Sequence, residues 1–152
     1  MGALGSTRKR QEPRSGRKRT PPTYASLKRL ADRVFSEWVR RRDSDSEGMV
    51  ACFTCGAVLP WRTIQAGHFV SRVHLSTRWD EKNVQSQCMA DNIWKRGSPA
   101  EFALALQRKY GPNIIAELVE KKRQSVKLTR AALQAIIEDY SGRLTAMPTQ
   151  TP

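Results

Sequence analysis

The stretch QCMADN, Gln87 to Asn92, decides how the middle of this chain is interpreted. An earlier stretch, CFTCG from Cys52 to Gly56, has the form of a zinc knuckle, in which a tight turn presents two thiolates to the ion. In QCMADN the matching second pair ends in an aspartate, and zinc accepts a carboxylate oxygen beside thiolate sulfurs. The spacing therefore predicts one structural Zn²⁺ with the ligands Cys52, Cys55, Cys88 and Asp91. The alternative is three ordinary buried cysteines and a surface aspartate.

The N-terminal segment has the composition of a disordered tail. Residues 1–23 contain seven bases against a single acid, Glu12, together with several prolines and almost no large apolar side chain. Nothing there offsets the entropy of ordering the backbone, so we expect residues 1–23 to be a disordered basic tail. Residues 24–145 are then one folded domain, and residues 146–152 are a second disordered tail.

The net charge of the chain predicts its class of partner. It is +13, and both the tail and the folded part contribute to it. Such a surplus of bases favours a polyanion, most often nucleic acid. The alternative is a solvated basic surface with no partner.

Membrane and secretory classes are disfavoured. No apolar run approaches the roughly 20 residues that a membrane span needs, and the N-terminus lacks the apolar core of a signal peptide. Three cysteines, an odd number, fit a reducing compartment and metal ligation better than a disulfide framework. We therefore expect a cytoplasmic protein with no membrane partner.

Residues 24–43, YASLKRLADRVFSEWVRRRD, predict an amphipathic helix. Apolar side chains recur in it at spacings of three and four residues, which predicts a buried face. That face consists of Leu27, Leu30, Val34 and Trp38. The bases of its last turn occupy other faces, where they can meet phosphates or simply be solvated.

The remaining segments predict an α+β fold. Short β-rich stretches cover residues 49–56 and 58–72, and residues 77–88 are expected to form a loop that returns the chain to the metal. Helices are predicted over residues 98–110 and 113–123, and a last one runs from the N-cap Thr129 to Leu144. A core of this size gains from a structural metal.

The candidate catalytic residues lie between and beside the two halves of the predicted zinc site. His68 stands in AGHFVSR, Asn83 in DEKNVQSQC, and Asn92 directly after Asp91. This order resembles the ββα-metal, or HNH, nuclease core, with a histidine ending the first strand, an asparagine in the loop and a polar residue opening the helix. A lone histidine is more often structural, and it is the company of the other residues that makes His68 a candidate.

The resemblance extends to one family. The segments RRRD, CFTCG, AGHFVSR, TRWDEKNVQSQC and KYG, over residues 24–145, resemble the phage NinG (Rap) recombination nucleases. It implies a small HNH core with a zinc knuckle, preceded by one helix and followed by about three. It also implies a metal-dependent endonuclease that hydrolyses phosphodiester bonds in branched DNA, of the Holliday junction or D-loop type, in a bacterial host cell.

The resemblance assigns roles to individual residues. His68 would be the general base, Asn83 would hold the loop, and Asn92 would offer its amide oxygen to a catalytic Mg²⁺ or Mn²⁺. The chain departs from the family pattern at Asp91, where the family has cysteine. Gly67 offers no side chain to the catalytic metal. One metal ligand is therefore unassigned, with the candidates His74, Asp80 and Glu81.

Basic residues are the expected DNA contacts, made to phosphates without reading sequence. They are Arg40, Arg41, Arg42, Arg72, Arg78, Lys95 and Arg96. Analogy with junction enzymes suggests a homodimer, and the family suggests a phage or host recombinase as partner. Two other functions stay open. One is a non-catalytic, zinc-stabilised DNA-binding recombination accessory protein, and the other is a restriction-type enzyme that cuts linear duplex.

Overall fold

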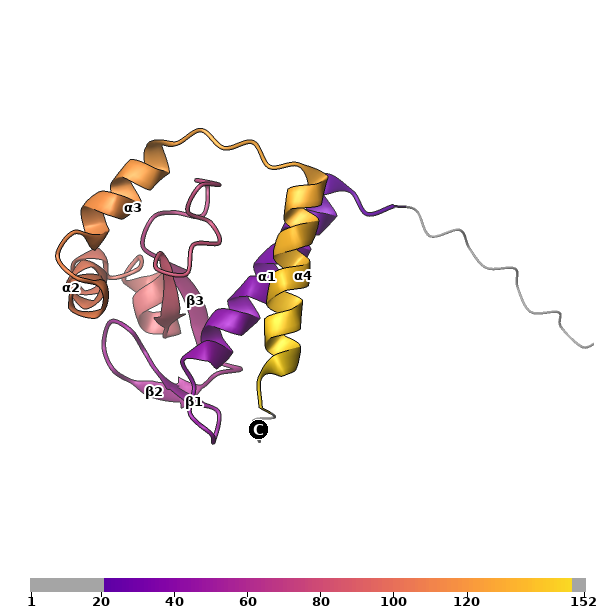
Figure 1. Cartoon of the computed structure of the whole chain (residues 1–152). Coiled ribbons are helices and arrows are strands. Elements are labelled where there is room, and N and C mark those ends of the chain that lie inside the picture. Colours follow the sequence, from indigo (N-terminus) through magenta and orange to yellow (C-terminus); the bar gives the residue numbers. More distant parts are fainter. Residues whose placement is uncertain (1–20, 149–152) are drawn as a thin grey trace, which may run out of the picture.

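The computed structural model describes residues 21–148, and Figure 1 shows their arrangement. The predicted basic tail, up to residue 20, and the last four residues of the predicted C-terminal tail lie outside this range. The helices and strands are, in chain order, α1 (Tyr24–Arg42), β1 (Met49–Ala51), β2 (Val58–Pro60), β3 (Gln65–His68), β4 (Val84–Gln87), the short π-helix η1 (Ala90–Trp94), α2 (Pro99–Tyr110), α3 (Ile114–Arg123) and α4 (Arg130–Ala146). The predicted mixture of helices and strands is confirmed.

The first helix begins where the sequence predicts, because the Thr23 side chain caps it by accepting a hydrogen bond of 3.1 Å from the Ser26 backbone N–H. Its buried face differs from the predicted one. Leu30 is 37% exposed, and the residues that are buried instead include Ala31 and Phe35. The prediction for Leu30 is wrong. The face of α1 that packs against α4 is shifted by about one residue around the helix from the face that we expected.

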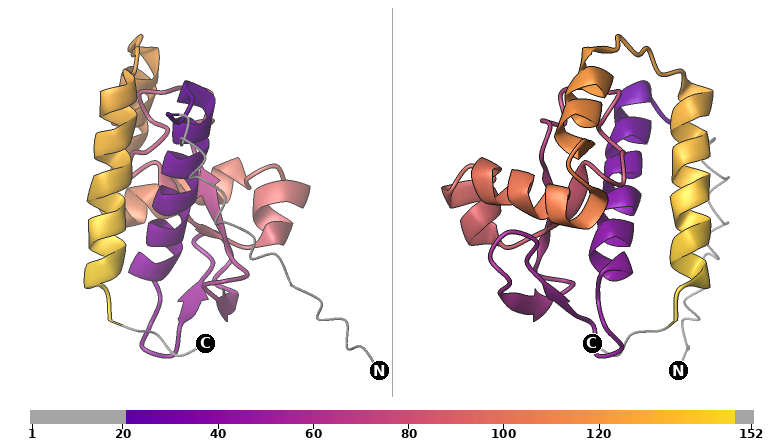
Figure 2. Two further views of the ribbon diagram at one scale, coloured as in Figure 1. Left: turned by 90° about the vertical axis from the view of Figure 1, so that its right-hand side faces the viewer. Right: turned by 60° about the vertical axis from the view of Figure 1, so that its left-hand side comes forward.

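Helices α1 and α4 lie side by side, as the views in Figures 1 and 2 agree. Tyr140 of α4 packs against Phe35 and Trp38, with ring centroids 4.8 and 5.0 Å apart. Further along, Leu133 is buried against Leu27. These apolar contacts pack the last helix of the described chain against the first one.

Two antiparallel two-stranded sheets occupy the middle of the molecule. Strand β1 pairs with β2, and β3 pairs with β4 so that His68 lies opposite Val84. The expectation that residues 77–88 form only a loop is wrong for their last part, because β4 is a fully buried strand. Its residues, VQSQ, are mostly polar, so no apolar pattern predicts a buried strand here. Val84 nevertheless packs into the cluster beneath α1.

Helices α2 and α3 form a second apolar cluster on the other side of the strands (Figure 1). Both begin and end close to the predicted positions, with Pro99 in the first turn of α2. Phe102 and Leu118 pack there against Val70, just after β3. The strands are therefore held between two helix pairs, and no helix within residues 21–148 has the length and apolarity to cross a membrane.

Gly67 is required by a close approach of two strands. A Cβ at this position would lie 2.1 Å from Oε1 and 3.0 Å from Cβ of Gln87, which is fully buried in β4. The Gln87 amide is fixed by donating 2.8 Å to the Gly97 carbonyl, so it cannot move aside freely. The missing side chain at Gly67 thus has a packing reason that is independent of any metal.

The Gly67→Ala substitution should lower the free energy of unfolding by about 1–3 kcal/mol through overpacking. Gly142→Ala is the matched control, because a Cβ there meets nothing within 4 Å on the exposed side of α4. That substitution should raise stability by roughly 0.5–1 kcal/mol through helix propensity. Urea unfolding of the three proteins measures both effects, and equal stability of the two variants would contradict the packing assigned to Gly67.

Candidate functional site

Four possible metal ligands converge from three segments of the chain. Cys52 and Cys55 lie on the tight turn after β1, which closes with a 2.9 Å hydrogen bond from the Gly56 N–H to the Cys52 carbonyl and needs the positive φ of 76° at Gly56. Cys88 directly follows β4, and Asp91 is buried in η1. One ligand atom from each residue lies within 4.8 Å of the other three. The structure therefore brings together all four predicted ligands.

The geometry of this cluster suits a tetrahedral ion. With zinc–sulfur bonds of about 2.3 Å, a tetrahedron places two sulfurs roughly 3.8 Å apart. The Sγ atoms of Cys55 and Cys88 are 3.8 Å apart, and Cys52 Sγ lies 3.8 Å from Oδ2 of Asp91. Three thiolates and one carboxylate are a donor set that zinc accepts. The cluster can hold a metal ion.

The electrostatics of the cluster also favour a cation. Burial raises the pKa of the Cys52 thiol, but hydrogen bonds from the Cys88 N–H and from Thr54 outweigh it, and the pKa falls to about 7. At Cys55 the Ala57 N–H lowers the pKa, yet burial and the neighbouring ligands raise it to about 12. Crowded anionic groups thus oppose ionisation of the last thiol, and a bound divalent cation removes that opposition.

Asp91 is held in place from both sides. The Thr54 hydroxyl donates to its Oδ2 at 2.6 Å, and the Lys95 ammonium lies 2.9 Å from its Oδ1. The Thr54 hydrogen bond, then that of Lys95, lowers the pKa of the Asp91 carboxyl to about 2, so the side chain is ionised although it is only 2% exposed. Lys95, a predicted phosphate contact, therefore pairs with Asp91, while its side chain stays 66% exposed.

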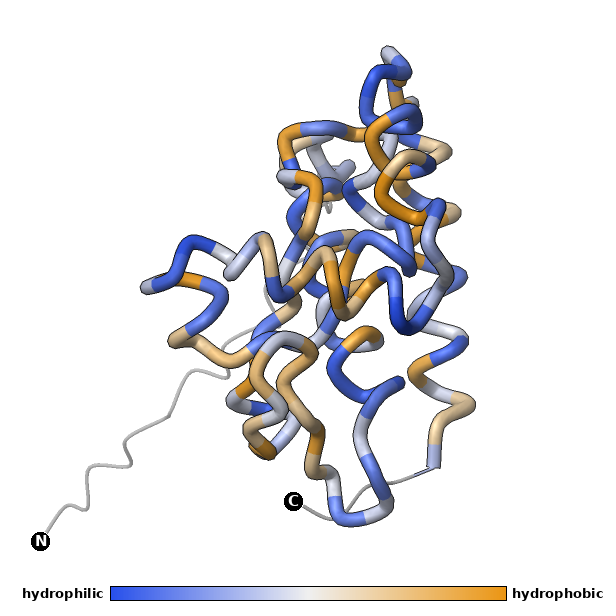
Figure 3. Tube along the Cα trace, turned by 90° about the vertical axis from the view of Figure 1, so that its left-hand side faces the viewer, coloured by the Kyte–Doolittle hydropathy of each residue, from blue (hydrophilic) through white to orange (hydrophobic). Residues whose placement is uncertain are grey.

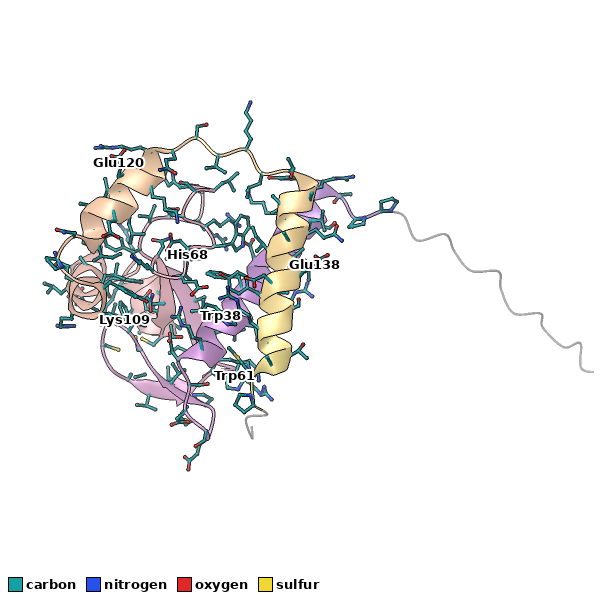
Figure 4. All side chains as sticks on the ribbon, viewed as in Figure 1. Trp38, Trp61, His68, Lys109, Glu120 and Glu138 are labelled. Atoms are coloured by element: carbon teal, nitrogen blue, oxygen red, sulfur yellow. The ribbon has the colours of Figure 1, made fainter. Side chains whose placement is uncertain are left out.

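His68 ends β3 with its ring in a defined tautomer. Its Nε2 lies 3.0 Å from the carbonyl oxygen of Arg78, and a carbonyl only accepts, so Nε2 carries the proton and Nδ1 keeps its lone pair. Burial lowers the pKa of the imidazole, and the charges of Arg78 and Arg72 lower it further. The ring is neutral at pH 7. Figure 4 shows His68 near the centre of the molecule.

Asn83 is fully buried and fixes the loop after His68. Its Oδ1 accepts from the Val70 N–H at 2.7 Å, while its Nδ2 donates to the Val70 and Thr77 carbonyls at 3.0 and 2.9 Å. Both ends of residues 70–77 are thereby tied to one side chain. Arg78 directly follows this loop, and its carbonyl oxygen is the acceptor for His68 Nε2.

Arg78 lies inside the fold and not on the DNA-facing surface that we expected. Its guanidinium makes a bidentate pair with Asp32 of α1, at 2.8 and 2.6 Å, and also donates to the Arg72 carbonyl. The side chain is 10% exposed. Because its own carbonyl accepts from His68, Arg78 connects α1 to the position of the imidazole.

His68 and Asn92 line the same open cavity of about 510 Å³. Asn92 donates through Nδ2 to Gln65 Oε1 at 2.7 Å, which leaves its amide oxygen available. The basic side chains of Arg72 and Arg96 also line the cavity, and both residues are exposed. One cavity thus combines a neutral base, an amide oxygen and two cations.

The three candidates for the unassigned metal ligand do not line this cavity. Asp80 pairs with Lys121 and accepts from the Lys82 N–H at 2.8 Å. Glu81 accepts from Tyr140 at 3.1 Å and pairs with an arginine of α4. His74 is likewise absent from the lining, and within residues 21–148 the lining contains no carboxylate.

Three further predicted DNA contacts are engaged within the protein. Arg40 donates to the Trp61 carbonyl at 3.1 Å, and Arg42 to Gln85 Oε1 at 3.1 Å. The Arg41 and Arg42 side chains are only 15% and 19% exposed, because their guanidiniums lie over the Trp61 and Trp38 rings. Their sequence pattern, a basic last turn of a helix, does not distinguish such packing from a surface role.

Sequence reasoning missed three residues of the site. Thr54 stands inside the CFTCG motif, and a hydroxyl between two ligands was a usable signal. Gln65 and Asp32 gave none, because a polar residue in a strand and an acid among the bases of α1 are ordinary surface patterns.

Removing the Thr54 hydroxyl should weaken metal binding, because it orients Asp91. Thr54→Val should lower the affinity for Zn²⁺ about 10- to 100-fold in competition with a chromophoric chelator. Thr63→Val is the matched control, since the Thr63 hydroxyl only contacts the Pro60 carbonyl at the surface. An unchanged affinity in Thr54→Val would show that Asp91 is not a ligand oriented in this way.

Comparison with known proteins places this chain. The family model described as Bacteriophage Lambda NinG protein matches residues 5–149. Proteins named ninG from Salmonella phage P22 and Escherichia phage 933W are each 25% identical over 115 residues, which is 75% of this chain and 54% of theirs. The chain thus spans about half the length of the curated relatives it matches. No solved structure is significantly similar. The chain belongs to the bacteriophage lambda NinG protein family.

Proposed function

We propose that this protein is a metal-dependent endonuclease that hydrolyses phosphodiester bonds in branched DNA, of the Holliday junction or D-loop type, during phage recombination. The observation that carries the proposal is the shared cavity, in which a neutral His68 with an available Nδ1 meets the Asn92 amide oxygen and two arginines. Hydrolysis of a phosphodiester needs a base for the attacking water and positive charge around the phosphate, and this cavity supplies both.

In this proposal His68 Nδ1 takes a proton from water while the water oxygen forms a bond to phosphorus. The bond from phosphorus to the leaving sugar oxygen then breaks, and that oxygen takes a proton from solvent. Arg72 and Arg96 stabilise the negative charge on the non-bridging oxygens. The fixed Nε2–H contact with the Arg78 carbonyl keeps Nδ1 directed away from that anchor throughout.

The catalytic cofactor in this proposal is Mg²⁺ or Mn²⁺, which would stabilise charge on the phosphate and the leaving oxygen. Asn92 Oδ1 is the one lining group among the predicted ligands that fits a hard cation. Magnesium commonly keeps several waters and completes its shell with substrate phosphates, so a single protein oxygen is compatible with the site. Asn83 would act only by holding the loop.

The second metal in the proposal is Zn²⁺ at the cluster of three cysteines and Asp91, and its role is structural. It would join the turn after β1 to the end of β4 and to η1, and η1 carries Asn92. DNA is held mainly through phosphates, by the exposed bases and the net charge of +13. A homodimer and a recombinase partner stay predictions from analogy.

His68→Ala should slow cleavage of a four-way junction about 10²- to 10⁴-fold in Mg²⁺ or Mn²⁺, through loss of the general base. Junction binding should change less than about threefold, since no phosphate contact is removed. His74→Ala is the matched control, because His74 is the only other histidine and does not line the cavity. Equal binding by all three proteins with cleavage by none would favour the accessory-protein function, and faster cutting of linear duplex would favour a restriction-type enzyme.

The pH dependence of cleavage should follow the lowered pKa of His68. The imidazole must be neutral to act, and its pKa lies below the ordinary 6.5, so the midpoint of the acidic fall in kcat/KM should lie below pH 6.5. Arg72→Gln removes a charge that lowers this pKa, so the acidic fall should move to higher pH. A wild-type rate that is already falling as pH drops from 8 to 7 would contradict the assignment of His68 as the base.

A further inference from the structure

Exposed apolar side chains lie in the lining of the candidate active-site cavity or directly after lining residues along the chain. Trp94 is 73% exposed and Val73 is 72% exposed, more than any other large apolar side chain within residues 21–148. Ile93, which is 54% exposed, lines the cavity itself. Val73 directly follows Arg72 and Trp94 directly follows Ile93, and both of these preceding residues line the cavity. We call Val73, Ile93 and Trp94 the apolar rim.

The segment that carries Trp94 is fixed and not a loose loop. The N–H groups of Asn92 and Lys95 donate to the Cys88 and Ala90 carbonyls, each at 2.9 Å, and Gly97 donates to the Asp91 carbonyl at 2.8 Å. Figures 2 and 3 show this part of the chain projecting from the side of the domain. A large apolar side chain is thus presented to solvent on a constrained turn, which costs solvation free energy without contributing to the core.

Backbone strain accompanies the exposed tryptophan. Arg96 and Ser98 have positive φ angles of 52° and 45°. Residues other than glycine rarely adopt this conformation. Such conformations persist where surrounding contacts enforce them, and they cluster at functional sites. One of the contacts that hold this turn is the hydrogen bond from the Gly97 N–H to the carbonyl of Asp91, one of the four possible metal ligands.

Charge around the apolar rim indicates what it contacts. Arg72 and Arg96 line the cavity beside it, and the one acid in η1, Asp91, is buried and paired with Lys95. An aromatic ring exposed among arginines is the combination that holds unpaired bases, because the ring stacks on the base and the cations contact the flanking phosphates. The cavity of about 510 Å³ lies within the range of small-molecule sites and can admit one nucleoside unit.

We propose that Trp94, supported by Ile93, is a stacking platform for an unpaired nucleobase of the DNA substrate. This inference rests on the proposed function and deepens it, because it names the feature of branched DNA that the site recognises. A branch point offers bases that are unstacked or easily unstacked, whereas a paired duplex does not. Stacking is tolerant of base identity, so it selects DNA structure without reading sequence.

The test compares binding of two DNAs that share one strand, a paired duplex and a splayed fork with unpaired arms. Fluorescence anisotropy is measured with Ca²⁺ in place of Mg²⁺ and Mn²⁺, so that binding is read in the absence of cleavage. Trp94→Ala should bind the fork roughly 5- to 150-fold more weakly and the duplex within twofold of wild type. Trp94→Phe should retain most of the fork affinity, because a phenyl ring still stacks.

Two controls keep the result specific. Leu104→Ala removes an exposed apolar side chain of α2, which is 57% exposed and outside the cavity, and should change neither affinity. Bound metal and melting temperature of Trp94→Ala should match wild type, since Trp94 is 73% exposed and does not belong to the core. Ultraviolet irradiation of a fork with 5-iodouracil in the unpaired arm should crosslink Trp94, identified by peptide mass spectrometry.

The inference would be overturned if Trp94→Ala lost affinity for both DNAs equally, or if it lost affinity for neither. It would also be overturned if the preference for the fork were unchanged and the crosslinks formed at other residues. These readouts do not require catalysis. A fork preference that disappears in Trp94→Ala, in a protein that cuts no DNA, would therefore retain the platform while rejecting the nuclease.

Discussion

Four possible ligand atoms within 4.8 Å of one another come from the turn after β1, the end of β4 and η1. The same three segments share a small apolar cluster and the hydrogen bond from Thr54 to Asp91. The strands involved are only three or four residues long, so their ladders alone contribute little stability. A metal ion bound by the four ligands would therefore be the fixed point of this half of the domain. Asn92, Ile93 and Trp94 would be placed by it, because they follow Asp91 directly along η1.

The other half of the site is placed by the helix pair. Packing of α4 on α1 fixes Asp32, which holds Arg78, whose carbonyl in turn holds the His68 ring. Burial of the ring has an electrostatic consequence, because it keeps the imidazole neutral and able to accept a proton. The segment after the ligand cluster and the helix pair thus contribute residues to one cavity.

Much of this arrangement follows from local sequence rules. The four helices are set by caps, a proline in a first turn and apolar periodicity, and the metal cluster is set by the spacing of its ligands. What failed depends on tertiary contacts. β4 is buried through glutamines that bond to neighbouring segments, and Leu30 is exposed because of where α4 docks. Arg40 and Arg41 at the α1 C-terminus lie over the ring of Trp61, about twenty residues further along the chain. No single-sequence pattern encodes such partners.

A titration of the His68 imidazole by ¹⁵N-edited NMR tests most directly whether this ring is neutral with its Nδ1 free, as the proposed role of general base requires. The chain has two histidines, so His74→Ala assigns the signals without ambiguity. We predict the tautomer protonated at Nε2 and a pKa below 6.5 in the metal-loaded protein. A ring protonated at Nδ1, or one with a pKa above 6.5, would contradict the account.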